Sequence, residues 1–135
     1  MPQLFQSFVA EWLRTNAPPG MTVRYQHTAQ LVANFEMEIH IDILLCEEGS
    51  QKPIAVLDTK YKASELPAED DIHQIAFYAG ELQVDHGIFV YPSTVAKPFK
   101  MVHAKKITIE SLVFDIAQPP DVAGSAFLDA LKANL

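Results

Sequence analysis

The chain has almost no cysteine: Cys46 is the only one among its 135 residues. A single thiol excludes an internal disulfide, and it excludes a zinc or iron–sulfur site built from several cysteines of this chain. Long apolar runs are also absent, and none approaches the roughly 20 residues that a membrane-spanning helix needs. The first residues, MPQLFQSFVAEWLR, have no basic start before the apolar positions, unlike a signal peptide. We therefore expect a cytoplasmic protein that makes no membrane contact.

Basic residues are scarce as well. Ten Lys and Arg residues stand against 17 Asp and Glu residues, which leaves a net charge of −7. Tight binding to nucleic acid depends mainly on Lys and Arg at the phosphates, so this charge opposes unaided binding of that kind. A metal-dependent enzyme that acts on nucleic acid is still compatible, because divalent ions supply positive charge at the site itself.

The length favours one domain, residues 1–135, with a core at about 4–92 and additional elements over 93–135. Apolar residues at helical spacing predict a helix over 2–15, and NAPPG ends it. The remaining expected elements are strands at 21–28, 36–48 and 54–62, a helix opening at 64–71, a strand at 86–92, one or two strands within 105–116, and a closing helix at 125–135. This order predicts a mixed α/β (α+β) fold.

The strand at 36–48 contains one acidic residue within an otherwise mostly apolar stretch, Asp42 in IHIDILL. Strict alternation puts Ile41 and Ile43 on one face of this strand and Asp42 on the other. In the next strand, alternation puts Ile54, Val56, Asp58 and Lys60 on a common face. Asp58 and Lys60 are thus expected where this strand leaves the core.

A short turn, EGSQKP, joins these two strands, which predicts an antiparallel pair with Asp42 close to Asp58. Two neighbouring carboxylates repel each other, so they either share a proton or bind a cation. Mg²⁺ prefers a few carboxylates together with water and substrate oxygens. A lysine beside such a pair, here Lys60, can orient or help to deprotonate a water molecule, or stabilise developing charge. The alternative for Asp58 and Lys60 alone is a simple ion pair at the end of the strand.

The following helix carries Gln74 and Tyr78, which are four residues apart and therefore lie on one helical face. Asp70 and Asp71 precede them by one turn and suit the helix dipole. A solvated face with a half-buried tyrosine is the alternative reading of Gln74 and Tyr78.

Taken together, Asp42, the run VLDTKYK, the run DIHQIAFYA and the strand GIFVYP resemble the PD-(D/E)XK nuclease superfamily. Gln74 and Tyr78 look like the QxxxY signature of its RecB-like branch. The order and spacing are most similar to the nuclease subunit (McrC-like) of McrBC-type 5-methylcytosine restriction systems. The resemblance covers residues 4 to about 116.

The resemblance implies a restriction-endonuclease-like core in the order αβββαβ, with a mixed central sheet flanked by helices. It implies divalent-metal-dependent hydrolysis of DNA phosphodiesters, with Mg²⁺ or Mn²⁺ held by Asp42, Asp58 and the backbone carbonyl of Thr59. Lys60 would hold or activate the water, and Gln74 and Tyr78 would steady the site or contact the substrate. The implied partners are DNA and an AAA+ GTPase subunit, and a homodimer is expected because duplex cleavage needs two sites.

The chain departs from the family pattern in three ways, of which one, Ile41 in place of the Pro of the PD motif, should matter little. Gln6 in LFQSFVAEWL stands where family members often carry Glu, and an amide binds a hard dication more weakly than a carboxylate. The chain also begins at the nuclease core, so the region that docks such subunits onto their GTPase partner is expected to be absent. The last two departures support a rival hypothesis, a catalytically weak or inactive interaction or dimerisation module with the nuclease fold.

Lysines supply a further set of candidate substrate contacts. Phosphate contacts are expected from five of them: Lys62, Lys97, Lys100, Lys105 and Lys106. A solvated loop is the alternative for the last four.

Overall fold

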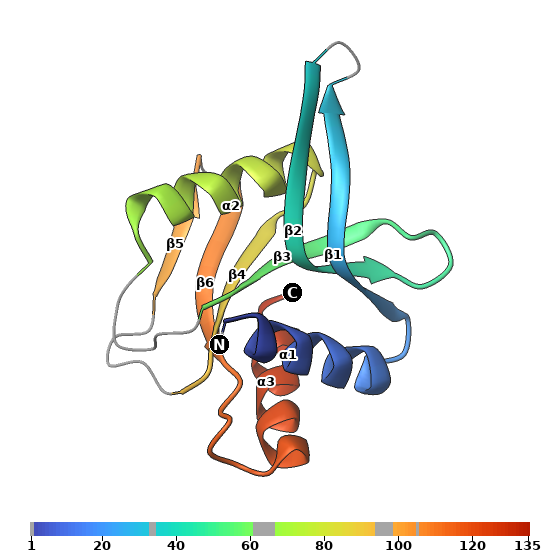
Figure 1. Cartoon of the computed structure of the whole chain (residues 1–135), viewed down its shortest axis with the longest axis vertical. Helices are drawn as coiled ribbons and strands as arrows, with labels where there is room; N and C mark the ends of the chain where they lie inside the picture. Colours follow the sequence, from blue (N-terminus) through green and yellow to red (C-terminus); the bar gives the residue numbers. More distant parts are fainter. Residues whose placement is uncertain (1, 33–34, 61–66, 94–98, 105) are drawn as a thin grey trace.

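The structure of the protein is a computed structural model that describes residues 2–32, 35–60, 67–93, 99–104 and 106–135. Side chains are described at all of these positions except 2, 3, 26–32, 35–40 and 134. The elements are α1 (Pro2–Asn16), β1 (Met21–Val32), β2 (Phe35–Glu47), β3 (Pro53–Thr59), α2 (Glu69–Glu81), β4 (His86–Tyr91), β5 (Lys100–His103), β6 (Ile107–Val113) and α3 (Pro120–Asn134). Figure 1 shows their arrangement.

The six strands of the described residues form one mixed sheet in the order β1-β2-β3-β4-β6-β5. The neighbours β1, β2 and β3 are antiparallel, β3 and β4 are parallel, β4 and β6 are parallel, and β5 is antiparallel to β6. The predicted α/β class and the order αβββαβ are confirmed. The parallel pairing of β3 with β4 follows from α2, which carries the chain back across the sheet.

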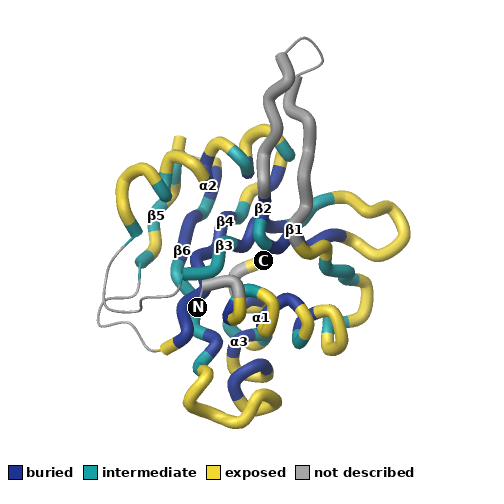
Figure 2. Tube along the Cα trace, viewed as in Figure 1, coloured by how far each residue is buried: buried dark blue, intermediate teal, exposed yellow. Residues whose placement is uncertain are grey.

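Helices cover both faces of the sheet (Figure 1). On one face, α1 and α3 pack on a cluster that includes Leu13, Leu57, Val90 and Phe127. On the other face, α2 packs through Ile75, Ala76 and Ala79. Both faces of the central strands are therefore buried, as Figure 2 shows along β3 and β4. The mostly apolar sequences of these strands follow from that burial.

Two expectations about strand faces are wrong. The first is that Ile41 and Ile43 share one face of β2. In the structure, Ile41 packs in the cluster under α2, whereas Ile43 packs in the cluster under α1 and α3. Among the described residues, β2 pairs with β3 over Ile43–Cys46, and the part of β2 that precedes Ile43 pairs with β1. Two-stranded ribbons twist more strongly than central strands, and β2 changes direction along its length in Figure 1.

Ile54 is the second exception, because it packs against the α1–α3 cluster rather than with Val56 on the α2 face. The register passes from Leu45↔Ala55 to Cys46↔Pro53, so Ile54 is an extra residue in β3. Such a bulge interrupts the alternation of side chains. Alternation resumes after it, and Val56 and Asp58 share the α2 face as expected.

Helices α1 and α3 approach closely at Gly124. A Cβ built at Gly124 would lie 2.1 Å from Cζ2 of Trp12, closer than two carbon atoms can approach. We expect Gly124→Ala to lower the free energy of unfolding by about 2–3 kcal/mol, because overpacking displaces the indole or the helix. Urea denaturation measures this loss.

Gly80→Ala in α2 is the matched control, because the nearest atom to its Cβ, Cδ1 of Ile107, is 4.0 Å away. Alanine has the higher helix propensity, so this variant should gain up to about 1 kcal/mol. Equal effects of the two substitutions would contradict close packing at Gly124.

Within the part of the chain that the structure describes, no helix is long and apolar enough to cross a membrane.

Candidate active site at the end of β3

Two carboxylates face each other where β2 and β3 separate. The two strands pair as far as Ile43↔Leu57, and one further step in this register sets Asp42 opposite Asp58. Both line a cavity of about 280 Å³ between the sheet and α2. Its other lining residues are Ile41, Val56, Leu57, Gln74, Ile75 and Tyr78. The predicted proximity of the two aspartates is thus a consequence of the hairpin.

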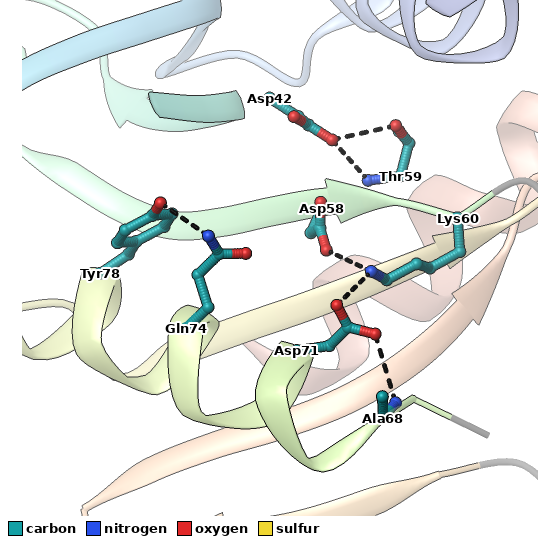
Figure 3. Close-up of polar contacts among 8 residues, drawn as sticks. All are labelled: Asp42, Asp58, Thr59, Lys60, Ala68, Asp71, Gln74 and Tyr78. Carbon is teal, nitrogen blue, oxygen red and sulfur yellow. Dashed lines mark hydrogen bonds and ion pairs between the residues drawn. The ribbon is translucent and has the colours of Figure 1, made fainter. Parts of the chain in front are cut away.

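Asp42 is oriented by the strand that it faces. Its Oδ2 accepts hydrogen bonds from the backbone N–H and the side-chain hydroxyl of Thr59, both at 3.1 Å (Figure 3). These two hydrogen bonds hold the Asp42 carboxyl in the lining of the cavity.

Asp58 lies in an environment that disfavours its charge. Burial and the neighbouring Asp42 carboxyl raise the pKa of Asp58 from 3.8 to about 7, although Lys60 lowers it. A carboxylate held in this way gains from a nearby cation, because the cation offsets both the lost hydration and the repulsion. Asp42 and Asp58 together have the oxygen chemistry that Mg²⁺ and Mn²⁺ prefer.

Lys60 lies directly after β3 and bridges two carboxylates. Its Nζ is 3.1 Å from Oδ2 of Asp58 and 2.9 Å from Oδ1 of Asp71, and 5.4 Å from the centroid of the Phe89 ring. Burial by itself lowers the pKa of Lys60, but Asp58 and Asp71 outweigh burial and raise the pKa above its ordinary value. Lys60 therefore forms the ion pair with Asp58 that the alternative hypothesis expects, in a partly buried position, and a second ion pair with Asp71 that the sequence did not predict.

Gln74 and Tyr78 reach the same cavity from α2. Nε2 of Gln74 donates a hydrogen bond of 3.0 Å to the hydroxyl of Tyr78 (Figure 3). The helix presents both side chains toward β3 because they are one turn apart, and Ile75 between them packs in the core. Gln74 is exposed and Tyr78 is half-buried, as the alternative of a solvated face with a half-buried tyrosine expects, and both also line the cavity with Asp42 and Asp58.

Asp71 was not among the residues expected at the site. It stands at the third position of α2, where its Oδ2 accepts a hydrogen bond of 3.2 Å from the backbone N–H of the N-cap residue, Ala68. Acidic residues at this position are typical of the capping box. The sequence showed this acid one turn before Gln74, but it contained no signal for the contact with Lys60.

Other expected residues lie elsewhere. Gln6 is on α1, on the opposite face of the sheet, and does not line the cavity. Lys100 lies on the edge strand β5, where its Nζ is 3.9 Å from Oε2 of Glu110. Lys106 is exposed before β6. Lys62, Lys97 and Lys105 lie outside the described residues. Substrate contacts from these lysines stay a prediction.

The site offers a divalent ion few protein ligands. Among the described residues, no group of three or more His, Cys, Asp or Glu side chains is placed to hold a metal ion. The two carboxylates of Asp42 and Asp58 would need additional oxygens from the backbone, water or substrate. Mg²⁺ is commonly bound in this way, with one or two carboxylates and retained water.

The pKa of Asp58 leads to a prediction about the metal-free protein. The folded state binds the Asp58 proton more tightly than the unfolded state, so the stabilisation is complete below about pH 4 and is lost as the pH rises through about 7. Between pH 5 and pH 8 this loss is on the order of 3 kcal/mol. Asp58→Asn should remove this dependence. Urea denaturation in EDTA at pH 5 and pH 8 measures the difference.

Glu110 also has a raised pKa, caused by burial, and it is present in both proteins. The comparison therefore concerns the difference between wild type and Asp58→Asn. If the free energy of unfolding had the same pH dependence in wild type and in Asp58→Asn, ionisation of Asp58 would not destabilise the folded protein.

Comparison with known families gives one match. The model of the McrBC 5-methylcytosine restriction system component matches residues 1–92, which include the whole candidate site. No curated protein shows significant similarity to the chain. Since the match spans more than half of the 135 residues, the chain belongs to the family of McrBC 5-methylcytosine restriction system components.

Proposed function

We propose that this chain is a divalent-metal-dependent DNA endonuclease domain of a restriction or defence system, with a PD-(D/E)XK site. The observation that carries the proposal is the meeting of Asp42, Asp58 and Lys60 at the end of β3, in a chain that belongs to a restriction-system family. Carboxylates for a metal and a cation for the phosphate are the groups that phosphodiester hydrolysis needs.

Asp42, Asp58 and the backbone carbonyl of Thr59 would hold Mg²⁺ or Mn²⁺. When bound, the ion would supply Lewis-acid charge at the phosphate and make water a better nucleophile. Asp42 is already oriented for this role by Thr59, and Asp58 gains most from a cation because its pKa is raised by burial and by Asp42.

Hydrolysis forms a bond between a water oxygen and phosphorus and breaks the ester P–O bond, with a proton passing to the leaving oxygen. Negative charge develops on the phosphate oxygens during this exchange. The Lys60 ammonium would stabilise that charge and orient the water, because its raised pKa keeps it protonated. Gln74 and Tyr78 would orient the substrate strand through their amide and hydroxyl groups.

The direct test is cleavage of plasmid DNA with Mg²⁺ or Mn²⁺, with and without a candidate AAA+ GTPase subunit. Wild type should nick or cut the plasmid, and Asp42→Ala should be inactive. EDTA should stop cleavage. Absence of cleavage by wild type in every condition would contradict the proposal.

One observation favours the rival function, an inactive interaction or dimerisation module. Within the described residues the site has two candidate acidic metal ligands, and Gln6 does not supply a third oxygen ligand there. In that case Asp42 and Asp58 would bind Mn²⁺ weakly and the plasmid would stay intact.

We further propose that the domain acts on DNA as a homodimer or with the GTPase subunit. Its net charge of −7 disfavours binding by one copy, and duplex cleavage needs a site for each strand. Sedimentation velocity and gel shifts at physiological salt should show weak DNA binding by the isolated chain. A monomer with nanomolar affinity for duplex DNA would contradict this expectation.

A further inference from the structure

The carboxylate of Asp71 joins the first turn of α2 to the end of β3. Its two oxygens serve different partners: Oδ2 accepts from the backbone N–H of Ala68 at 3.2 Å, and Oδ1 lies 2.9 Å from Nζ of Lys60 (Figure 3). The hydrogen bond to Ala68 fixes the orientation of the carboxylate, because the helix backbone is rigid. The contact with Lys60 is thereby held at a defined position.

Lys60 depends on such a contact. Its backbone is anchored, since its N–H donates to the carbonyl of Val90 at 2.8 Å. Its side chain is a flexible four-carbon stem, so the backbone alone does not fix the position of the ammonium. Among the described residues, its ammonium forms ion pairs with Asp58 and Asp71.

These two partners differ in their relation to the cavity. Asp58 lines it and is a proposed metal ligand, whereas Asp71 does not line it. A divalent cation at Asp58 would repel the ammonium of Lys60, because like charges at short range disfavour each other. Asp71 stays available to hold Lys60 when Asp58 is engaged.

We propose that Asp71 is a positioning residue that keeps the ammonium of Lys60 beside the Asp42–Asp58 pair while a cation occupies Asp58. The consequence for catalysis rests on the proposed nuclease function. The consequence for the position of Lys60 does not, and it can be measured in the metal-free protein.

The experiment compares Asp71→Asn with Asp70→Asn. Asp70 is exposed in the same first turn, so its variant has the same change of charge near the same helix end. An asparagine at 71 can still accept the hydrogen bond from Ala68, but it lacks the charge that attracts Lys60. Asp71→Glu is the rescue variant, because glutamate is a preferred residue at this capping position.

Three quantities are measured on each protein. The first is kcat and KM for plasmid cleavage with Mg²⁺. The second is the affinity for Mn²⁺ by calorimetry. The third is the ¹³C–¹H NMR signal of the Lys60 ε-methylene in metal-free protein, assigned by its loss in Lys60→Arg. The two ε-protons of a held side chain have different shifts, and those of a freely rotating one coincide.

For Asp71→Asn we expect kcat to fall about 10–100-fold with KM and Mn²⁺ affinity unchanged, since a misplaced catalytic group costs rate rather than binding. The two ε-protons of Lys60 should become equivalent. Asp70→Asn should match wild type in all three measurements, and Asp71→Glu should recover part of kcat and the inequivalent protons.

Unchanged ε-protons in Asp71→Asn would overturn the proposal, whether or not the protein cleaves DNA. An unchanged kcat in an active protein would overturn it as well. If wild type does not cleave DNA, the proposed function fails, and the NMR comparison still decides whether Asp71 positions Lys60.

Discussion

Lys60→Ala should abolish DNA cleavage and leave the fold and Mn²⁺ binding nearly intact. The ammonium of Lys60 lies beside Asp58 and is held there by Asp71, so its removal takes a cation from the place where phosphate charge would develop. Loss of one such stabilising group typically costs about 10²–10³ in kcat. A protonated lysine has no lone pair for a metal, so the carboxylates should bind the ion without it. Plasmid cleavage, thermal melting and Mn²⁺ calorimetry on one preparation measure all three properties.

Lys132→Ala is the matched control for this substitution. Lys132 is exposed in the last turn of α3, on the opposite face of the sheet, and its variant loses the same charge. It should cleave DNA as wild type does. An ion pair without a catalytic role would have the opposite effect in Lys60→Ala, with a small loss of stability and full activity. A fully active Lys60→Ala protein would therefore show that Lys60 has no catalytic role and only forms ion pairs with Asp58 and Asp71.

Asp58→Ala should weaken Mn²⁺ binding by at least about 100-fold. Even groups that only support metal ligands change affinity about 10–100-fold, and Asp58 is expected to be a ligand itself. Burial and the neighbouring Asp42 destabilise the ionised form of Asp58, and the substitution removes this charge. The metal-free variant should therefore not be less stable than wild type at pH 8. Calorimetry measures the affinity, and urea denaturation in EDTA measures the stability.

Asp129→Ala provides the comparison for net charge, because Asp129 is exposed on α3 far from the cavity. It should bind Mn²⁺ with the affinity of wild type. Equal affinities in Asp58→Ala and wild type would remove the carboxylate pair from consideration as a metal site. The proposed nuclease activity would then lack its metal.

The amphipathic patterns of the sequence located the three helices and most strands of the described residues, although α3 begins at Pro120 instead of residue 125 and the edge strand β5 (Lys100–His103) was not expected. The spacing of Phe5, Val9 and Leu13 predicted α1, and all three are buried against the sheet. The pattern of Ile75, Ala76 and Ala79 predicted α2 in the same way. These predictions hold because one face of each helix packs on the sheet, so the periodicity of burial is the periodicity of the helix.

The candidate site was also accessible from the sequence in large part. A short turn between two strands forces an antiparallel pair, and the register follows from its length, so Asp42 and Asp58 had to approach. Gln74 and Tyr78 share a helical face by spacing alone. Their approach to the aspartates required α2 to pack on the face of the sheet that carries Asp58.

Long-range contacts set the remaining features. Alternation in the sequence cannot show a bulge at Ile54 or the twist of β2 beyond Ile43, because both depend on where neighbouring strands begin and end. In the sheet, β6 lies between β4 and β5, and this order likewise depends on pairing between segments that are distant in the sequence.

Local sequence thus determined most of the elements, the hairpin that brings Asp42 to Asp58, and the candidate residues of the site. The tertiary structure decided the environment of these residues. Burial and Asp42 raise the pKa of Asp58, and Asp71 reaches Lys60 from a helix that begins nine residues after it. The physical reason is that charge energies depend on distance and desolvation in three dimensions, and neither is encoded by residue spacing along one strand or helix.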